Sequence, residues 1–248
     1  MREKDTHHLR NDYLKRIREL LFPPRCPVCD EVLGAQDRQR LICRDCAGKI
    51  SFIHEPRCLK CGMALEDETE EYCSSCKKRR HIYDSGLALF EYSPLRTSMY
   101  RFKYSGRAEY AKFYGRAAAR YLGEQIRKWQ PEGVIPVPMY APKERMRGYN
   151  QAELFARALG NELSIPVYND IVIRRRKTSP MKRLNARQRH VNLKNAFIIG
   201  RNDVKLRRVL VVDDIYTTGS TIDAVAAVLK ASGTEKVFFV TLSGGNGI

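Results

Sequence analysis

Hydrophobic residues in the last two thirds of the chain follow two alternating spacings. Short apolar runs bounded by Gly, Pro or charged residues predict strands. These runs cover residues 85–92, 133–139, 207–214 and 234–244. Apolar residues at helical spacing predict helices over residues 94–107, 108–129, 148–163 and 222–233, with Asn150 or Gly148 near the start of the third. Strands that alternate with helices form a parallel sheet covered by helices, so the predicted fold class is α/β.

The first 80 residues have a different pattern. Between Leu9 and Leu21 apolar residues again fall at helical spacing, and Pro23-Pro24 is expected to end that helix. Residues 24–80 are polar, and a basic run over 77–80 closes them. Such a segment needs a metal to order it. We therefore predict an amphipathic helix over 1–23, a metal module over 24–80 and the α/β domain over 81–248.

All eight cysteines lie in this metal module and form four C-x-x-C pairs. Two such pairs supply the four thiolates of a tetrahedral zinc site, so the sequence predicts two structural Zn²⁺ ions. We expect sequential pairing, with cross-braced pairing as the alternative. The first predicted site holds Cys26, Cys29, Cys43 and Cys46, and the second holds Cys58, Cys61, Cys73 and Cys76. Because cysteine fills every coordination position, no substrate is expected at the metal.

Composition narrows the class of partner. The 248 residues include 45 Lys and Arg against 28 Asp and Glu, and the formal net charge of +17 favours polyanionic ligands. No apolar run approaches the roughly 20 residues of a membrane span. The charged N-terminal segment has none of the apolar core of a secretory leader. These features predict a cytoplasmic protein.

The stretch VLVVDDIYTTGSTI carries the most specific chemical signal. A buried strand delivers Asp213 and Asp214 to the edge at which open α/β sheets bind ligands. The following loop combines hydroxyls, backbone N–H groups and a helix N-terminus, which together suit a phosphate. The loop consists of Thr217, Thr218, Gly219, Ser220 and Thr221. Two carboxylates can accept hydrogen bonds from vicinal hydroxyls. A ribose 5-phosphate therefore suits both the carboxylate pair and the phosphate-type loop.

This stretch resembles the phosphoribosyl pyrophosphate (PRPP) motif of type I phosphoribosyltransferases. The resemblance implies that Asp213 and Asp214 hold the ribose hydroxyls and that the loop from Thr217 to Thr221 holds the 5-phosphate. It implies that Mg²⁺ accompanies the pyrophosphate of PRPP. In that fold the loop after the IPVP strand holds pyrophosphate, which here points to Lys143, Arg145 and Arg147, with ordinary solvated charge as the alternative.

The same resemblance places a flexible loop over residues 174–190. Closure of that loop would exclude water and stabilise charge on departing pyrophosphate. The stretch contains no acidic residue and eight cations: Arg174, Arg175, Arg176, Lys177, Lys182, Arg183, Arg187 and Arg189.

The order of motifs along the chain resembles the ComF family of late competence proteins, ComFC-like in arrangement. It comprises the double C-x-x-C module, RFKYSGR, a segment with R-x-R-G-Y-N-Q, and the PRPP motif. The family usually has Phe where Tyr149 stands. The resemblance implies a part in natural transformation, with uptake of single-stranded DNA and a helicase-like partner of the ComFA type.

Two functions stay open at this point. One is a competence factor that binds PRPP and single-stranded DNA through its basic clusters at 174–190 and 77–80. Tyr72 and Tyr83 are candidates for base stacking, with a packing role as the preferred alternative. The other is an active phosphoribosyltransferase of unknown acceptor. Only SGGNGI follows the last strand, so we expect no C-terminal hood for an acceptor base, and no catalytic base is evident.

Overall fold

The computed structural model describes residues 22–176, 196–200 and 204–244. Contacts divide the chain into two compact units, one up to Lys49 and one from Ile50 onward. The predicted helix over 1–23 lies almost wholly outside the described residues, as does most of the predicted flexible loop. The unit boundary falls between the two groups of cysteines.

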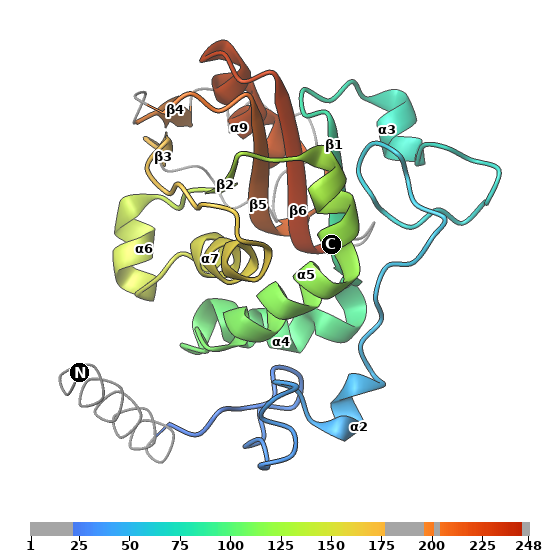
Figure 1. The fold of residues 1–248 in the computed structure, drawn as a ribbon, viewed down its shortest axis with the longest axis vertical. Helices are drawn as coiled ribbons and strands as arrows, with labels where there is room; N and C mark the ends of the chain where they lie inside the picture. The colour runs from blue at the N-terminus through green and yellow to red at the C-terminus, as the bar shows by residue number, and fades with distance from the viewer. Residues whose placement is uncertain (1–21, 177–195, 201–203, 245–248) are drawn as a thin grey trace, which may run out of the picture. The chain divides into compact units, whose positions relative to one another are not determined.

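A four-stranded parallel sheet forms the centre of the second unit (Figure 1). Its order is β1 (Ser85–Glu91), β6 (Lys236–Gly244), β5 (Arg208–Tyr216) and β2 (Gly133–Pro136). Val209 through Val212 of β5 are all fully buried, because strands covered on both faces bury both alternating sets of side chains. The predicted parallel α/β sheet is confirmed.

Helices cover both faces of this sheet (Figure 1). One face carries α4 (Tyr92–Tyr104), α5 (Tyr110–Trp129) and α7 (Gln151–Leu163), and the other carries α9 (Ser220–Ala231). Asn150 caps α7: its side chain accepts a hydrogen bond from the Ala152 N–H and donates one to the Val137 carbonyl. This cap ties the start of α7 to the end of β2.

Three elements differ from the sequence expectation. The loop expected after β2 contains a helix, α6 (Ala141–Arg147), which ends at Gly148 in a left-handed conformation with φ 89°. A two-stranded antiparallel sheet of β3 (Val172–Arg174) and β4 (Phe197–Ile199) flanks the segment expected to be a flexible loop. Both strands lie against α9.

Each group of cysteines carries one short helix. They are α2 (Arg44–Ala47), which follows Cys43, and α3 (Ser74–Lys78), which follows Cys73. The second group packs into the unit that holds the sheet. A Cβ added to Gly62, which has φ 68°, would lie 2.3 Å from the carbonyl oxygen of Gly86 in β1. The backbone at Gly62 therefore packs directly against the backbone of β1, with no room for a side chain.

Candidate functional site

The cysteines form two groups of four, Cys26 to Cys46 and Cys58 to Cys76, in sequential order. Within each group all four Sγ atoms lie within 4.8 Å of one another. A tetrahedral zinc with Zn–S bonds of about 2.3 Å places its sulfurs about 3.8 Å apart. The Cys29–Cys43 and Cys61–Cys73 Sγ distances are 3.8 and 3.7 Å, and no cysteine is in a disulfide. The donor set fits two structural zinc ions.

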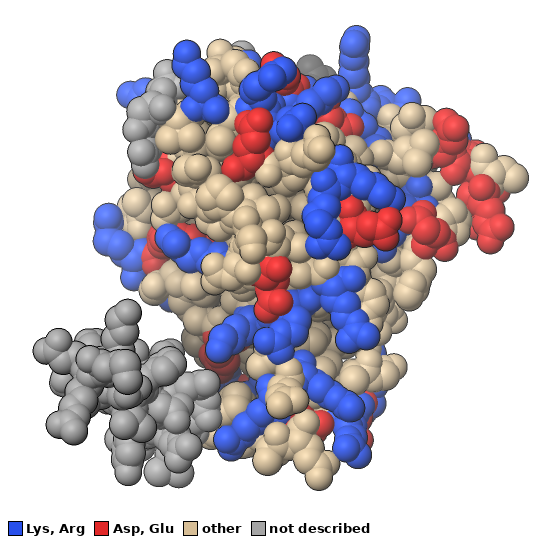
Figure 2. Space-filling view, viewed as in Figure 1, with Lys and Arg blue, Asp and Glu red and all other residues tan. Residues whose placement is uncertain are grey.

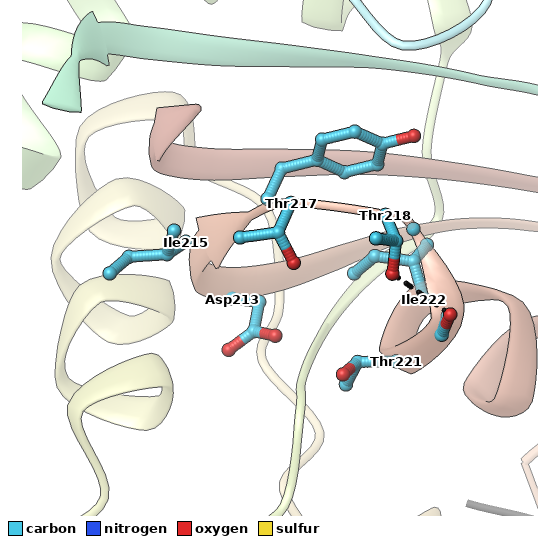
Figure 3. A pocket seen from close by; sticks show the side chains of 9 residues that line it. Asp213, Ile215, Thr217, Thr218, Thr221 and Ile222 are labelled. Atoms are coloured by element: carbon cyan, nitrogen blue, oxygen red, sulfur yellow. Dashed lines mark hydrogen bonds between the residues drawn. The ribbon is translucent and has the colours of Figure 1, made fainter. Parts of the chain in front are cut away.

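The phosphate-type loop lies at the carboxyl end of β5, where it leads into α9. Gly219 precedes the helix with φ 71°, and its carbonyl accepts a hydrogen bond from the Asp223 N–H at 2.8 Å. A small cavity of about 20 Å³ is lined by Asp213 and the residues from Ile215 to Ile222. Figure 3 shows the oxygen atoms of Asp213, Thr217 and Thr221 around the same opening. The hydroxyls of Thr218 and Ser220 are 2.9 Å apart.

Residues that directly follow the second cysteine group in the chain form hydrogen bonds with this loop and with α9. Arg79 Nη1 donates to the Thr218 carbonyl at 3.0 Å. His81 Nδ1 lies 2.8 Å from Asp223 Oδ2 in α9, and the Ile82 N–H donates to Asp223 Oδ1 at 2.7 Å. A Cβ on Gly219 would come within 2.9 Å of the His81 ring, so only glycine fits between the loop and this support.

A pair of tyrosines extends the same support. The hydroxyls of Tyr83 and Tyr216 are 2.7 Å apart, and the Tyr83 ring stacks on His81 with centroids 4.7 Å apart. Tyr216 is the last residue of β5 and stacks on Phe239 of β6 at 5.0 Å. Tyr83 is completely buried, so its role is packing and it cannot contact a base.

The two carboxylates at the end of β5 have different surroundings. Asp214 forms an ion pair with Lys103 of α4 at 2.7 Å. Asp213 has no such pair among the described residues, and its Oδ1 accepts the Asp214 N–H at 2.8 Å. Burial raises the pKa of Asp213 to about 7, and the neighbouring Asp214 charge adds to the rise, although Lys103 and Arg174 oppose it. The Asp213 carboxyl therefore titrates at higher pH than an ordinary aspartate.

The cations expected to hold pyrophosphate lie on or beside α6. Arg147 places its guanidinium 4.8 Å from the centroid of the Tyr104 ring and also contacts Gln151. Partial burial lowers the pKa of Lys143, and the charge of Arg147 lowers it further. Arg145 is exposed. A cavity of about 210 Å³ lies here, lined by Lys103, Tyr104, Gly106, Lys143, Met146 and Arg147.

The cavity and the acidic pair share one residue. Lys103 lines the cavity and forms the ion pair with Asp214, so the cationic hollow adjoins the expected ribose position. Tyr149, where the resembling family usually has Phe, uses its hydroxyl to donate to the Phe102 carbonyl at 2.7 Å. That bond joins α4 to the start of α7 and stabilises one wall of the hollow.

Only the first three cations of the expected flexible loop are described. Arg174 ends β3, and burial lowers its pKa while the charge of Asp213 opposes the shift. Arg175 and Arg176 are exposed. The other five predicted cations lie outside the described residues, namely Lys177, Lys182, Arg183, Arg187 and Arg189.

Comparison with known proteins assigns both halves of the chain. Residues 17–77 match the double zinc ribbon domain and residues 150–247 match the phosphoribosyl transferase domain. "Competence protein F" of Haemophilus influenzae is 34% identical over 206 residues, which cover 79% of this chain and 87% of the relative. The chain belongs to the competence protein F family.

Two further relatives are more distant. "DNA utilization protein YhgH" of Escherichia coli K12 is 29% identical over 79% of this chain and 87% of its own length. "Competence protein ComFC" of Streptococcus pneumoniae is 26% identical over 79% of this chain and 84% of its own length. Within the described ranges, no helix combines the length and the hydropathy that crossing a bilayer requires.

The structure adds residues that sequence reasoning did not assign to the site of this competence protein F relative. Lys103 lies in the RFKYSGR segment, but nothing in its spacing pairs it with Asp214. Arg79 belongs to the basic run 77–80, whose other described members are exposed, and its contact with Thr218 spans 139 positions. His81 gave no signal, because its partner Asp223 lies 142 positions away.

Proposed function

We propose that this competence protein F relative binds PRPP with Mg²⁺ at the carboxyl edge of its sheet, as part of the handling of single-stranded DNA in natural transformation. The observation that carries the proposal is the cavity lined by Asp213 and the loop from Ile215 to Ile222 within the matched phosphoribosyl transferase domain. Family membership supports the competence role.

The proposed binding mode assigns each group of PRPP to a chemically matched region. The 5-phosphate binds the loop from Thr217 to Thr221, where α9 begins and its free N–H groups favour an anion. The ribose hydroxyls donate to Asp213 and Asp214. The pyrophosphate, with Mg²⁺ on its oxygens, extends toward Lys143, Arg145 and Arg147, and Lys103 exchanges its ion pair with Asp214 for the incoming charge.

Single-stranded DNA and a helicase-like partner of the ComFA type complete the proposed role, with a cytoplasmic location. The net charge of +17 supports a polyanionic partner. Exposed Arg175 and Arg176 lead into the basic segment up to residue 190 and supply phosphate contacts.

Isothermal titration calorimetry with PRPP and Mg²⁺ tests the site directly. Asp213→Asn combined with Asp214→Asn is expected to abolish PRPP binding, because neither ribose hydroxyl keeps a charged acceptor. Thermal unfolding should change little, since both side chains lie at the mouth of the strand. Asp67→Asn, an exposed acid on the second ribbon, is the matched control and should bind PRPP like the wild type. Wild-type affinity in the double variant would show that the ribose site is misassigned.

An active phosphoribosyltransferase is the second candidate function. The cavity of about 210 Å³ beside Lys103 is the observation that favours it, because an acceptor molecule could enter next to the ribose position. Release of pyrophosphate from PRPP, measured across a panel of acceptor bases and nucleic acids, separates the two functions. Binding without release supports a ligand-binding factor, and release with any acceptor supports an enzyme.

A further inference from the structure

Helix α4 presents two exposed tyrosines on its outer face. Leu95, Met99 and Phe102 bury the inner face of the helix. Tyr100 and Tyr104 lie one turn apart on the opposite side and are 61% and 60% exposed, with ring centroids 5.2 Å apart. Exposed aromatic rings grouped on one face are a feature of interaction sites.

Basic side chains lie next to both tyrosines. The Arg147 guanidinium lies 4.8 Å from the centroid of Tyr104, and Arg96 is exposed one turn before Tyr100. Tyr104 also lines the cavity beside α6, whose other described lining residues include Lys103 and Lys143 and no acid. Rings interleaved with cations suit a ligand that has both flat faces and negative charges.

Tyr121 on α5 is another exposed tyrosine, and its surroundings differ from those of the pair on α4. Tyr121 is 50% exposed and its ring stacks on Phe52 at 3.7 Å, but unlike Tyr104 it does not line the cavity beside α6. Charge alone does not locate a binding face either, because Figure 2 shows basic side chains spread across the whole view with acidic ones among them. The pairing of rings and cations on α4 is therefore more informative than the net charge.

We propose that Tyr100 and Tyr104 form the surface on which this protein stacks the bases of single-stranded DNA, with Arg96, Lys143 and Arg147 beside the phosphates. The proposal rests on the proposed DNA-handling function and names its contact face. Successive bases stack on aromatic rings without regard to sequence, and cations follow the backbone. A duplex hides the flat faces of its bases, so the surface selects single strands.

The location gives the surface a connection to the PRPP site. Lys103, which pairs with Asp214, lies next to Tyr104 in the chain and lines the same cavity. A strand stacked on α4 would thus run past the opening that adjoins the ribose carboxylates. Because Lys143 and Arg147 are also the cations proposed for the pyrophosphate, DNA and PRPP would compete for this part of the cavity.

Fluorescence anisotropy with two labelled strands tests the stacking directly. One strand is oligothymidylate, and the other is an abasic deoxyribose phosphate strand of the same length and charge. Wild type should bind the thymidylate strand at least about 10-fold more tightly, since each stacked base contributes favourably. In Tyr100→Ala with Tyr104→Ala this preference should disappear, while the slope of log affinity against log salt stays the same because the phosphate contacts remain.

Two matched variants serve as controls. Tyr100→Phe with Tyr104→Phe keeps both rings and should retain the preference for bases. Tyr121→Ala removes a similarly exposed tyrosine from α5 and should bind both strands like the wild type. Thermal unfolding of each variant reports whether the fold persists.

The outcomes distinguish this proposal from the function on which it rests. Thymidylate binding by the double alanine variant equal to that of wild type would overturn the stacking surface and leave DNA binding intact. Equal wild-type affinity for both strands would also overturn it. Absence of any DNA binding by wild type at low salt would overturn the DNA role itself, and PRPP calorimetry would then report separately on the metabolite site.

Discussion

The two groups of four cysteines have the same chemistry and different surroundings. Both place their sulfurs at tetrahedral zinc spacing, and both use a short helix after the third cysteine. The first group belongs to the compact unit that ends at Lys49. The second lies in the unit of the sheet, where Cys58, Cys61 and Met63 join the same buried cluster as Val211 and Phe239. The same cysteine geometry thus occurs in two structural settings, a small separate unit and the core of the sheet unit.

The second group differs most in the segment that comes after it in the chain. Helix α3 leads within a few residues to Arg79 and His81, which bond the phosphate-type loop and α9. Arg57 Nη1 donates to the Ala88 carbonyl of β1 at 3.1 Å, so the ribbon is also joined to the edge of the sheet. The zinc of this group is therefore expected to stabilise the position of the phosphate-type loop, whereas the first zinc is expected to stabilise its own ribbon.

The largest expected effect comes from removing cysteines of one group at a time. Cys58→Ser with Cys61→Ser should prevent folding of the sheet unit or make the protein insoluble. Zinc binding contributes about 10–16 kcal/mol in small zinc domains, which is as large as the roughly 5–15 kcal/mol of total stability that typical domains have. Cys26→Ser with Cys29→Ser should keep one zinc per chain and bind PRPP within about twofold of wild type. Metal analysis, thermal unfolding and calorimetry measure these outcomes.

A milder route covers the case in which the second-group variant cannot be purified. Timed chelation of the wild type should separate into two phases, and loss of PRPP binding should accompany only the phase that remains in the Cys26→Ser, Cys29→Ser protein. If that variant loses PRPP affinity on its own, the two groups do not differ in the way proposed.

A smaller effect tests the connection between the ribbon and the loop. Arg79→Ala removes the donor to the Thr218 carbonyl and should weaken PRPP binding by about tenfold, in line with a charged hydrogen bond of about 1.5 kcal/mol. The loop then has to be ordered by the ligand itself. Calorimetry with PRPP and Mg²⁺ is the measurement.

The adjacent residue provides the control. Arg80→Ala removes the same charge from an exposed position in the same basic run, so its effect on PRPP should be within about twofold. Equal losses in the two variants would mean that general charge, rather than the bond to Thr218, links this segment to the site.

The helices and strands differ in how well the sequence predicts them. The four parallel strands and the helices α4, α5, α7 and α9 were predictable, because each has a strong apolar period or a continuous apolar run. Helix α6 has only seven residues, APKERMR, and no apolar stripe. The strands β3 and β4 have three residues each and pair across a polar stretch, so they gave no periodic signal.

Within the site, the local chemistry could be predicted and the tertiary support could not. The cavity of Asp213 and Thr217 to Thr221 depends on a strand, a glycine and a helix start that are contiguous in sequence. The bonds of Lys103 to Asp214 and of Arg79 to Thr218 join residues more than 100 positions apart, and no spacing rule connects such positions. For the same reason, the sequence could not distinguish the roles of the two zinc ribbons.

The smallest expected effect is the pH dependence of PRPP affinity, which tests the contribution of the carboxylates independently of the zinc ribbon. In the proposed binding mode, the ionised carboxylate of Asp213 would accept hydrogen bonds from ribose better than the protonated form. With a pKa of about 7, the ionised fraction and hence PRPP affinity should rise about threefold between pH 6.5 and 7.5.

The stability of the free protein should change with pH in the opposite direction. The folded pKa is raised above the 3.8 of an ordinary aspartate, so the contribution of Asp213 to the free energy of unfolding is fully present below about pH 4 and is lost as pH rises through about 7.

Three variants locate the source of this pH dependence. Asp214→Asn removes the neighbouring negative charge, so the pKa of Asp213 should fall and the rise in affinity should move to lower pH. Arg79→Ala and the Cys26→Ser, Cys29→Ser protein should keep the wild-type midpoint, because neither change touches the acidic pair. Calorimetry with PRPP and Mg²⁺ across this pH range gives the midpoint for each protein. A midpoint that moves in Arg79→Ala but not in Asp214→Asn would assign the titration to the ribbon side of the loop and remove Asp213 as its origin.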